Sequence, residues 1–509
     1  MRCTTTWLSA SERDLVIDSA LAVLERVGMC FKGAAIVGAL EERGALVDHE
    51  TGIVRMPEAL VREALASLPG VWAMGGATEA QDVVFDRRNG PHFNPSACIA
   101  KTLDFRTGQL RPSTLQDIRE GSTVMDATPE IDLMWTFATA NDVPVERREL
   151  VEYHAYLSNT AKPLVFVDCP TETEPVRRIM EVVGGSLEEF RRRPRLGLVC
   201  AVRAPLEVNS HLLDVTCEFA RLGAPIFAYC MTMVGATSPV TVAGTLAQMW
   251  AELLGMVTVV QVAAPGAPVL VCCGPGILDM RTSSMSLGSP ENTLMGVASV
   301  EIGHHLGLPV HNPGLSSDAK HPGLQAGYEK GMKALPAALA GVDLISGGFG
   351  ALDSSSVWHL PMVPIDAEVA RLVKRLVAGA EITPETVMLE VIERVGVGGN
   401  FLKEKVTRER VRAGEHFQPV IGSRLPFEQW VLEGRAETDE ARAIVEATLA
   451  ARASEGSGAL LSDDQLAAVA DICGADARAS RSDPPARRRL AAAVRPGRPR
   501  PAPASRRRA

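Results

Sequence analysis

Short, almost wholly apolar runs alternate with amphipathic stretches from about residue 90 onward. Strands that are apolar at nearly every position are buried on both faces, which is typical of a parallel sheet covered by helices. Seven runs are expected to be strands: Ile131–Phe137, Pro163–Cys169, Leu196–Val202, Pro225–Met231, Pro268–Cys273, Leu308–Asn312 and Val342–Ser346. With one more strand near Ser96–Asp104, they predict a (β/α)8 TIM barrel of the α/β class. A doubly wound open sheet is the alternative.

The regions that flank the barrel have a different pattern. Residues 1–90 are predicted to form a mostly helical N-terminal cap, whose first helix starts at a capping box of Ser9 and Glu12. Residues 91–362 are assigned to the barrel and residues 363–452 to a C-terminal helical region. Residues 453–509 are rich in Ala, Arg, Pro and Ser, which predicts a disordered basic tail.

Charge and composition narrow the class of protein. The formal net charge is -9, and residues 481–509 hold ten Arg and one Asp, so the rest of the chain carries about -18. An acidic body argues against nucleic acid as the main partner. The chain shows no signal-peptide pattern, no uninterrupted apolar run of 18 residues and no paired cysteine framework. We therefore expect a cytoplasmic protein without a membrane span.

The densest group of polar residues follows the sixth expected strand. In a TIM barrel the active site lies at the carboxyl ends of the strands. Residues His311–Pro322 contain two His, one Asp and one Lys, which favours Asp318 as an acid, base or cation-binding group. The alternative is an Asp–Lys pair that only holds the loop together. Upstream, Ser289 and Pro290 predict a helix start, and Glu291 either contacts ligand or complements the helix dipole.

Adjacent Cys272 and Cys273 raise the possibility of a metal. Two thiolates with a third ligand can bind zinc, and zinc activates thiols for methylation. The chain contains no CxxC spacing, however, and buried free cysteines are common. We expect no metal in this chain and keep a zinc-thiolate methyltransferase as an alternative function.

Seven segments in order along the chain together resemble the trimethylamine methyltransferase family. They are DFRTGQLRPSTLQD (104–117), GATSPVTVAGTLAQ (235–248), PGAPV (265–269), GSPE (288–291), SSDAKHPGLQAGYEK (316–330), GVGGNFL (396–402) and FQPVIGSRLPFEQW (417–430). The resemblance extends from about residue 10 to residue 450. It implies a (β/α)-barrel enzyme that moves a methyl group from a methylated amine to the cobalt of a separate corrinoid protein.

The resemblance also implies a substrate class and a partner. The founding members carry pyrrolysine in the barrel, and the expected equivalent here is Gly314–Ser316, so this chain resembles the members that lack it. Those members are associated with quaternary amines such as glycine betaine. The chain has no DxHxxG corrinoid-binding motif. A small corrinoid-binding protein would therefore supply the methylcorrinoid, no cofactor would bind this chain, and we expect a homo-oligomer.

A quaternary ammonium is bound by aromatic faces and carboxylates, and a substrate carboxylate requires a hydrogen-bond donor. Asp318 and Glu291 are the catalytic candidates. The substrate-binding candidates are Tyr229, His311, Gly314, Ser316, Phe349, Trp358 and His359. Besides the zinc-thiolate enzyme, a non-catalytic barrel that binds betaine is the remaining alternative.

Overall fold

A computed structural model of the chain describes residues 4–95, 98–433, 435–455 and 460–474. Its central sheet has eight parallel strands in the order β6-β18-β17-β14-β12-β11-β10-β9. They are β6 (His92–Pro95), β9 (Met134–Trp135), β10 (Leu164–Phe166), β11 (Leu196–Val202), β12 (Ile226–Cys230), β14 (Val269–Cys273), β17 (Val310–Asn312) and β18 (Leu344–Gly348). The two end strands meet where the Asp132 amide donates to the Phe93 carbonyl, at 2.8 Å. The sheet is a nearly closed barrel, which confirms the predicted fold.

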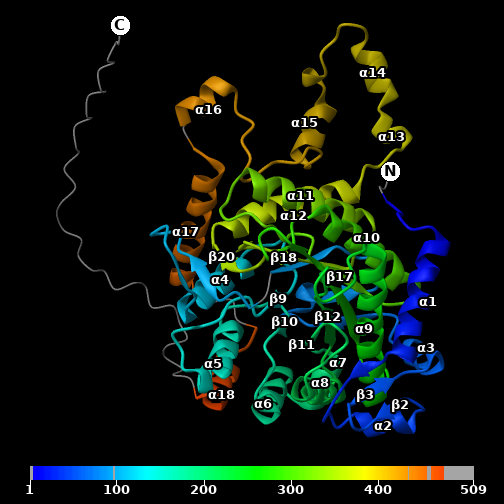
Figure 1. Cartoon of the computed structure of the whole chain (residues 1–509). Coiled ribbons are helices and arrows are strands. Elements are labelled where there is room, and N and C mark those ends of the chain that lie inside the picture. The colour runs from blue at the N-terminus through cyan, green and yellow to red at the C-terminus, as the bar shows by residue number, and fades with distance from the viewer. Residues whose placement is uncertain (1–3, 96–97, 434, 456–459, 475–509) are drawn as a thin grey trace, which may run out of the picture.

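Figure 1 looks roughly along this barrel and shows helices arranged around the strands. The ring consists of α4 (Leu115–Asp126), α5 (Val145–Leu157), α6 (Thr173–Gly184), α8 (Ser210–Leu222), α9 (Val242–Ala263), α10 (Pro290–His305), α11 (Leu324–Leu339) and α12 (Met362–Ala378). Alternating strands and helices place every strand's carboxyl end at one mouth of the barrel.

One barrel strand lies earlier in the chain than expected. The eighth strand is His92–Pro95, not Ser96–Asp104. Lys101–Leu103 (β7) instead joins a separate sheet with β8 (Leu110–Pro112), β19 (Ala351–Leu352) and β20 (Val357–Trp358). The reason is that β6 carries polar His92 and Asn94 at alternate positions, so it lacks the apolar run by which the other strands were recognised.

The N-terminal region covers one side of the barrel. The helices α1 (Ala10–Arg26) and α3 (Glu58–Ala66) pack on α9, and α2 (Val37–Glu42) lies beside the antiparallel strands β1 (Met29–Cys30), β2 (Leu46–Asp48) and β3 (Ile53–Arg55). The capping box of Ser9 and Glu12 is present, as predicted. Because α9 is covered by these helices and by strands, it is apolar on all sides. Among the described helices it alone has the length and composition to span a membrane, but it is mostly buried in the core.

A second hairpin closes the amino-terminal end of the barrel. The strands β4 (Trp72–Met74) and β5 (Val83–Phe85) pair antiparallel, and the rings of Trp72 and Phe85 stack with centroids 4.3 Å apart. Both rings meet Phe227 of β12 edge-on, at 6.4 Å and 6.5 Å. Edge-to-face aromatic packing of this kind is dense, so the hairpin covers this end of the barrel.

The structure differs from the predicted disordered tail at its beginning. The helix α17 (Glu437–Glu455) is followed by α18 (Asp463–Cys473), which starts at a capping box of Ser462 and Gln465. Val469 and Ala470 of α18 are buried, and this helix packs against α5 and α6. A few apolar side chains on one face of α18 pack this helix against the barrel. The Ala-rich composition of the segment did not predict it. Residues 475–509 lie outside the described residues.

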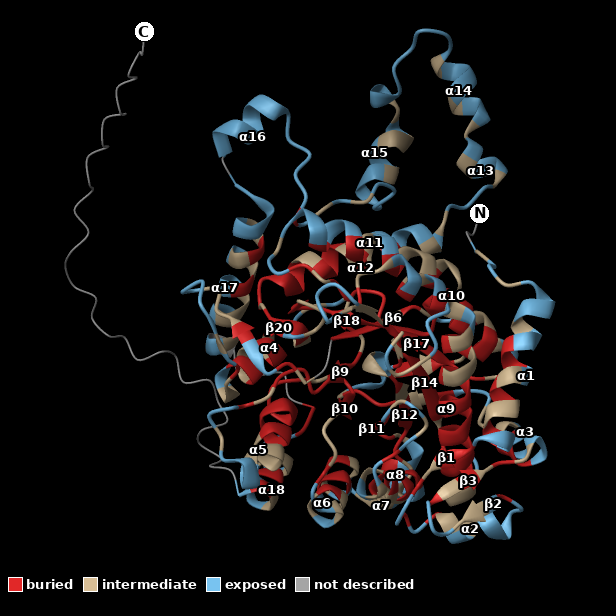
Figure 2. Cartoon of the chain, viewed as in Figure 1, coloured by how far each residue is buried: buried red, intermediate tan, exposed pale blue. Residues whose placement is uncertain are grey.

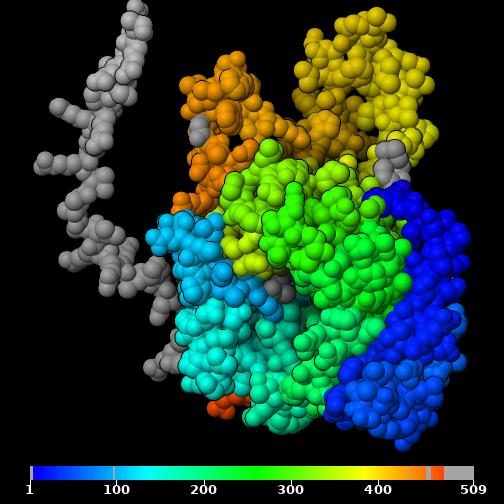
Figure 3. Space-filling view, viewed as in Figure 1, coloured from blue at the N-terminus to red at the C-terminus, as the bar shows by residue number. Residues whose placement is uncertain are grey.

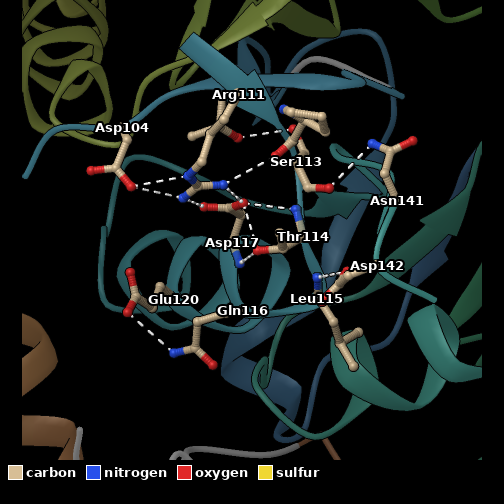
Figure 4. A network of polar contacts seen from close by, with 12 residues as sticks. Asp104, Arg111, Ser113, Thr114, Leu115, Gln116, Asp117, Glu120, Asn141 and Asp142 are labelled. Atoms are coloured by element: carbon tan, nitrogen blue, oxygen red, sulfur yellow. Dashed lines mark hydrogen bonds and ion pairs between the residues drawn. The ribbon is translucent and has the colours of Figure 1, made fainter. Parts of the chain in front are cut away.

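The segment DFRTGQLRPSTLQD forms a polar clamp at the start of α4 (Figure 4). The Arg111 guanidinium donates to both oxygens of Asp117, at 2.7 Å and 2.9 Å, and to Asp104 at 3.0 Å. Asp117 also completes a capping box with Thr114. These charge-assisted bonds tie the β7–β8 hairpin to the helix, so this segment is scaffold near the mouth.

Replacing Asp117 by Ala is expected to lower the free energy of unfolding by about 2 kcal/mol, because it removes the acidic partner of the Thr114 capping box and leaves Arg111 with fewer partners. Chemical denaturation followed by circular dichroism measures the loss. Glu63→Ala removes an exposed ion pair with Arg43 and serves as the control, with an expected change below about 1 kcal/mol. Equal losses in the two variants would contradict the role assigned to Asp117.

Candidate active site

Side chains from four strands meet inside the barrel near its open end. Tyr229 of β12, Cys272 of β14 and His311 of β17 are aligned in register on neighbouring strands, so their side chains share the inner face. Trp135 of β9 completes the group, and its ring stacks on His311 with centroids 5.2 Å apart. We call Trp135, Tyr229 and His311 the aromatic cluster.

The rings of the aromatic cluster hold one another in place. Tyr229 lies 6.2 Å from Trp135 and 5.7 Å from His311, measured between ring centroids. Trp135 and His311 are buried, whereas Tyr229 is half-buried. Tyr229 therefore presents its ring towards the mouth, while the other two rings fix its orientation from behind.

The aromatic cluster is electrically neutral. Burial lowers the pKa of His311 to about 3 and raises the pKa of the Tyr229 phenol, so the imidazole and the hydroxyl are both uncharged near pH 7. His311 Nε2 is hydrogen-bonded to the Ser346 hydroxyl. His311 Nδ1 and the Trp135 Nε1 group are buried without a partner. Buried polar atoms are rarely left unpaired, so these two nitrogens mark a place for a ligand or water.

The barrel is open beyond the aromatic cluster. Ala201 and Arg203 of β11 and its following loop are exposed, and so is Met231 after β12. Ala201 is aligned with Tyr229 in the sheet, so its exposure shows that the inner face of the wall is accessible at this level. Seen along the barrel, the surface is hollowed near the centre of the ring of helices (Figure 3).

Asp318 joins three loops at the mouth. Its carboxylate accepts hydrogen bonds from the Leu287 and Gly288 amides, at 2.8 Å and 3.0 Å, and from the hydroxyls of Ser286 and Ser354. These hydrogen bonds keep the pKa of Asp318 low although burial opposes them. With four hydrogen-bond donors on its carboxylate, Asp318 holds the loops after β14, β17 and β18 together.

Two side chains of α11 extend this network inward. Glu329 accepts hydrogen bonds from the Ser317 hydroxyl and the Asp318 amide, at 2.7 Å and 2.8 Å. Buried Lys333 donates to the Leu287 carbonyl and to the Ser316 hydroxyl. The segment Gly288–Lys330 therefore shapes the mouth mainly as a rigid frame.

Of the residues predicted for the site, only Tyr229 and His311 lie in the aromatic cluster. Gly314 and Ser316 are buried behind the mouth loops, and Glu291 is exposed at the first turn of α10. Three others lie outside the barrel wall: Phe349 against Phe93, Trp358 against Phe137, and His359 on the Leu103 carbonyl. Their predicted contacts with substrate stay predictions.

Comparison with known proteins places this barrel in a family. The family model described as trimethylamine methyltransferase (MTTB) matches residues 2–457. The chain belongs to this family. It is 29% identical to a trimethylamine methyltransferase of Desulfitobacterium hafniense over 84% of this chain and 85% of the relative. It is 31% identical to one of Methanosarcina mazei, over 77% and 80%, and 26% identical to a glycine betaine methyltransferase of D. hafniense strain Y51, over 84% and 88%.

Membership of the trimethylamine methyltransferase family makes the chain a methyltransferase. The structure also tests whether Cys272 and Cys273 could bind zinc together. Cys272 and Cys273 are consecutive in β14, so their side chains point to opposite faces of the sheet. Cys272 packs with Phe227 inside the barrel, whereas Cys273 lies with the residues outside it. The two thiols therefore cannot bind one zinc ion. In the described ranges no three His, Cys, Asp or Glu side chains gather at a metal-binding distance.

Trp135 is the member of the aromatic cluster that the sequence did not single out. It lies inside the expected strand Ile131–Phe137, whereas the candidate for this strand lies beyond the strand's end. A signal was available, because Leu133 and Trp135 alternate with residues that face the helices. Inward-facing positions within a strand therefore indicate site residues, as the strand ends do.

Proposed function

We propose that this chain transfers a methyl group from a zwitterionic quaternary amine, such as glycine betaine, to a corrinoid carried by a separate protein at the barrel mouth. The neutral aromatic cluster is the observation that carries the proposal. Trp135, Tyr229 and His311, together with the inner neighbours Cys272 and Ser346, contribute no ionised group. A substrate without net charge fits such a lining, because a net charge would be buried without a counter-ion.

Each part of a betaine has a partner in this arrangement. The Tyr229 ring offers an aromatic face to the quaternary ammonium. If Ser346 donates to His311 Nε2, the imidazole proton lies on Nδ1, and this N–H and the Trp135 N–H are free to donate to the substrate carboxylate. A substrate held in this way directs one methyl group towards the exposed side at Ala201 and Met231.

The chain's own contribution is positioning and exclusion of water. The aromatic cluster fixes the ammonium, the frame around Asp318 fixes the mouth loops, and exposed Glu291 at the rim is available to a docking partner. A reduced corrinoid on the partner would supply the nucleophile that accepts the methyl group. The nine described cysteines are all free thiols, which fits a reducing compartment such as the cytoplasm.

The direct test mixes the purified chain with glycine betaine and a reduced corrinoid protein, and follows dimethylglycine formation and the corrinoid absorbance. Transfer from glycine betaine and none from trimethylamine is the expected result. If no quaternary amine tried gives methyl transfer to the corrinoid, the proposal is wrong. Tight betaine binding without transfer to any corrinoid protein would instead identify a non-catalytic binding barrel.

Gly274→Ala is expected to weaken betaine binding at least tenfold, or about 1.4 kcal/mol, with the fold retained. A Cβ at residue 274 would overlap the Tyr229 hydroxyl and push the ring from its place. Titration calorimetry measures the affinity. Gly327→Ala on α11 is the matched control, because nothing lies near its added methyl group. Unchanged affinity in Gly274→Ala would show that Tyr229 does not contact the substrate.

A further inference from the structure

A cleft lies at the amino-terminal end of the barrel, opposite the mouth. It is lined by the turns that precede three neighbouring strands, β11, β12 and β14, and by β4 of the hairpin that covers this end. In Figure 2 the turns around α7 (Leu187–Arg192) and α8 are tan and pale blue, in contrast to the red strands. The cleft has a volume of about 420 Å³. Sites for small molecules span about 300–1,000 Å³, so the cleft can hold such a ligand.

One wall of the cleft is apolar. Trp72, Ala220 and Ala267 line it and are buried, and Pro268, which also lines it, is half-buried. The ring of Trp72 stacks on Phe85 and is therefore held in a fixed position. The wall is thus a preformed surface, and an apolar group can pack against it without reorganising the protein.

The rim of the cleft is basic. Residues 191–195 have the sequence RRRPR, and Arg191 lines the cleft together with Arg221 from the last turn of α8. Both arginines are exposed, and within the described ranges neither guanidinium is paired with a carboxylate. Arg191 Nη2 instead approaches the Arg221 carbonyl, at 3.5 Å. Two positive charges without a counter-ion therefore lie at one rim, although the chain outside residues 481–509 carries a formal charge of about -18.

The backbone before β12 fixes Arg191 at this rim. Gly223 has a φ of +91°, and an added Cβ would lie 2.6 Å from the Arg191 Cγ atom. The absence of a side chain at Gly223 thus lets Arg191 lie across the turn. Arg192, the third arginine of the lining, donates to Glu188 and Glu189 at 2.8 Å and 2.6 Å and is already neutralised. A ligand in the cleft therefore meets two unpaired guanidinium groups, not three.

A simpler account of these arginines is that they stabilise helix ends. Cations in the last turn complement the helix dipole, and Arg191 and Arg221 both occupy such turns. The dipole, however, requires neither a cavity beside the cations nor two cations at one rim. The cleft with its apolar wall is the observation that this account leaves unexplained.

We propose that the cleft binds a small organic phosphate of nucleotide size. Arg191 and Arg221 bind the phosphate, because guanidinium groups donate pairs of parallel hydrogen bonds to phosphate oxygens. The wall around Trp72 packs against the base or another apolar part of the ligand. An anion without an apolar part would leave this wall exposed to water, so the two surfaces together favour an organic phosphate over a simple anion.

The cleft is distinct from the proposed site of methyl transfer. Phe227 of β12 lies between the two sites, since its ring meets Trp72 at 6.4 Å and Trp135 of the aromatic cluster at 5.9 Å. A ligand in the cleft therefore does not contact the aromatic cluster and does not compete with a substrate bound there. For this reason the inference does not rest on the proposed substrate.

Titration calorimetry of the full chain with adenosine monophosphate tests the proposal. We expect one site per chain with a Kd below about 1 mM. Adenosine lacks the phosphate, and inorganic phosphate lacks the apolar part, so each should bind at least tenfold more weakly. If adenosine monophosphate does not bind, or if citrate binds as tightly, the proposal is wrong.

Two pairs of substitutions locate the site. Arg191→Gln with Arg221→Gln should weaken binding of adenosine monophosphate at least tenfold, and Arg221→Gln alone serves if the double change disturbs folding. Arg281→Gln with Arg394→Gln removes the same charge from exposed arginines elsewhere and should leave the Kd unchanged. Equal weakening in the two pairs would overturn the proposal. Tighter binding of a polyglutamate peptide, lost in the cleft variant, would assign the cleft to an acidic protein segment and would also overturn it.

Discussion

Asp366→Asn is expected to lower the free energy of unfolding by about 3–5 kcal/mol, because it leaves the buried Lys330 ammonium without its counter-ion. Lys330 Nζ lies 2.8 Å from Asp366, and both side chains are fully buried. Asp366 also accepts the Gly350 amide at 3.1 Å, and Lys330 donates to the Ala351 carbonyl at 3.1 Å. The pair thereby joins α11 and α12 to the loop after β18. Urea denaturation measures the loss.

Two further variants decide whether the loss comes from the unpaired charge. Lys330→Met with Asp366→Leu removes both charges and should recover part of the stability, because the two positions are in contact and their effects are not additive. Glu188→Gln breaks an exposed ion pair with Arg192 and should change stability by less than about 1 kcal/mol. If the double variant is less stable than Asp366→Asn, the Lys330–Asp366 pair stabilises the fold by more than the mutual neutralisation of its two charges.

The barrel could be predicted because its strands are buried on both faces. Seven of the eight were found from apolar runs such as Leu196–Val202, which is β11 without change of bounds. β6 escaped because its inner residues His92 and Asn94 are polar. The helix α18 escaped because only a few of its residues are buried, and composition averages over them. Local patterns therefore reveal buried elements that are apolar, and miss a buried strand with polar inner residues or a helix with few buried positions.

The site was harder to predict than the barrel. A segment rich in polar residues does not show in which direction their side chains point. The segment after β17 was expected to be the centre of the site. The Asp318 carboxylate, however, accepts its hydrogen bonds from neighbouring loops. Phe349 and Trp358 follow a strand end, but they pack between the barrel and its helices. Tyr229 and His311 were predicted to bind substrate; both lie in the aromatic cluster, and their contact with substrate stays a prediction. Register across parallel strands decides which side chains meet, and register is set by tertiary structure.

The frame at the mouth should make stability depend on pH through Lys333. Burial lowers the pKa of Lys333 to about 7, against the attraction of Asp318 and Glu329. Below pH 7 the lysine is protonated in the folded and the unfolded chain. Between pH 7 and about 10.4 only the unfolded chain keeps the proton, so unfolding takes up a proton. The free energy of unfolding should therefore rise with pH in this window, by at most about 1.4 kcal/mol per unit.

Urea denaturation at pH 7, 8 and 9 measures that slope, and Lys333→Met isolates its source. The variant has no side chain at this position that can take up a proton on unfolding. Its free energy of unfolding should therefore rise less steeply with pH than that of the wild type, by the contribution of Lys333 alone. Lys320→Met is the matched control, because Lys320 is exposed on the loop before α11 and pairs with Asp353 at the surface. Identical slopes in wild type and Lys333→Met would mean that Lys333 keeps its proton when buried. In that case its three oxygen partners, the Leu287 carbonyl and the Ser316 carbonyl and hydroxyl, would outweigh the cost of burying the charge.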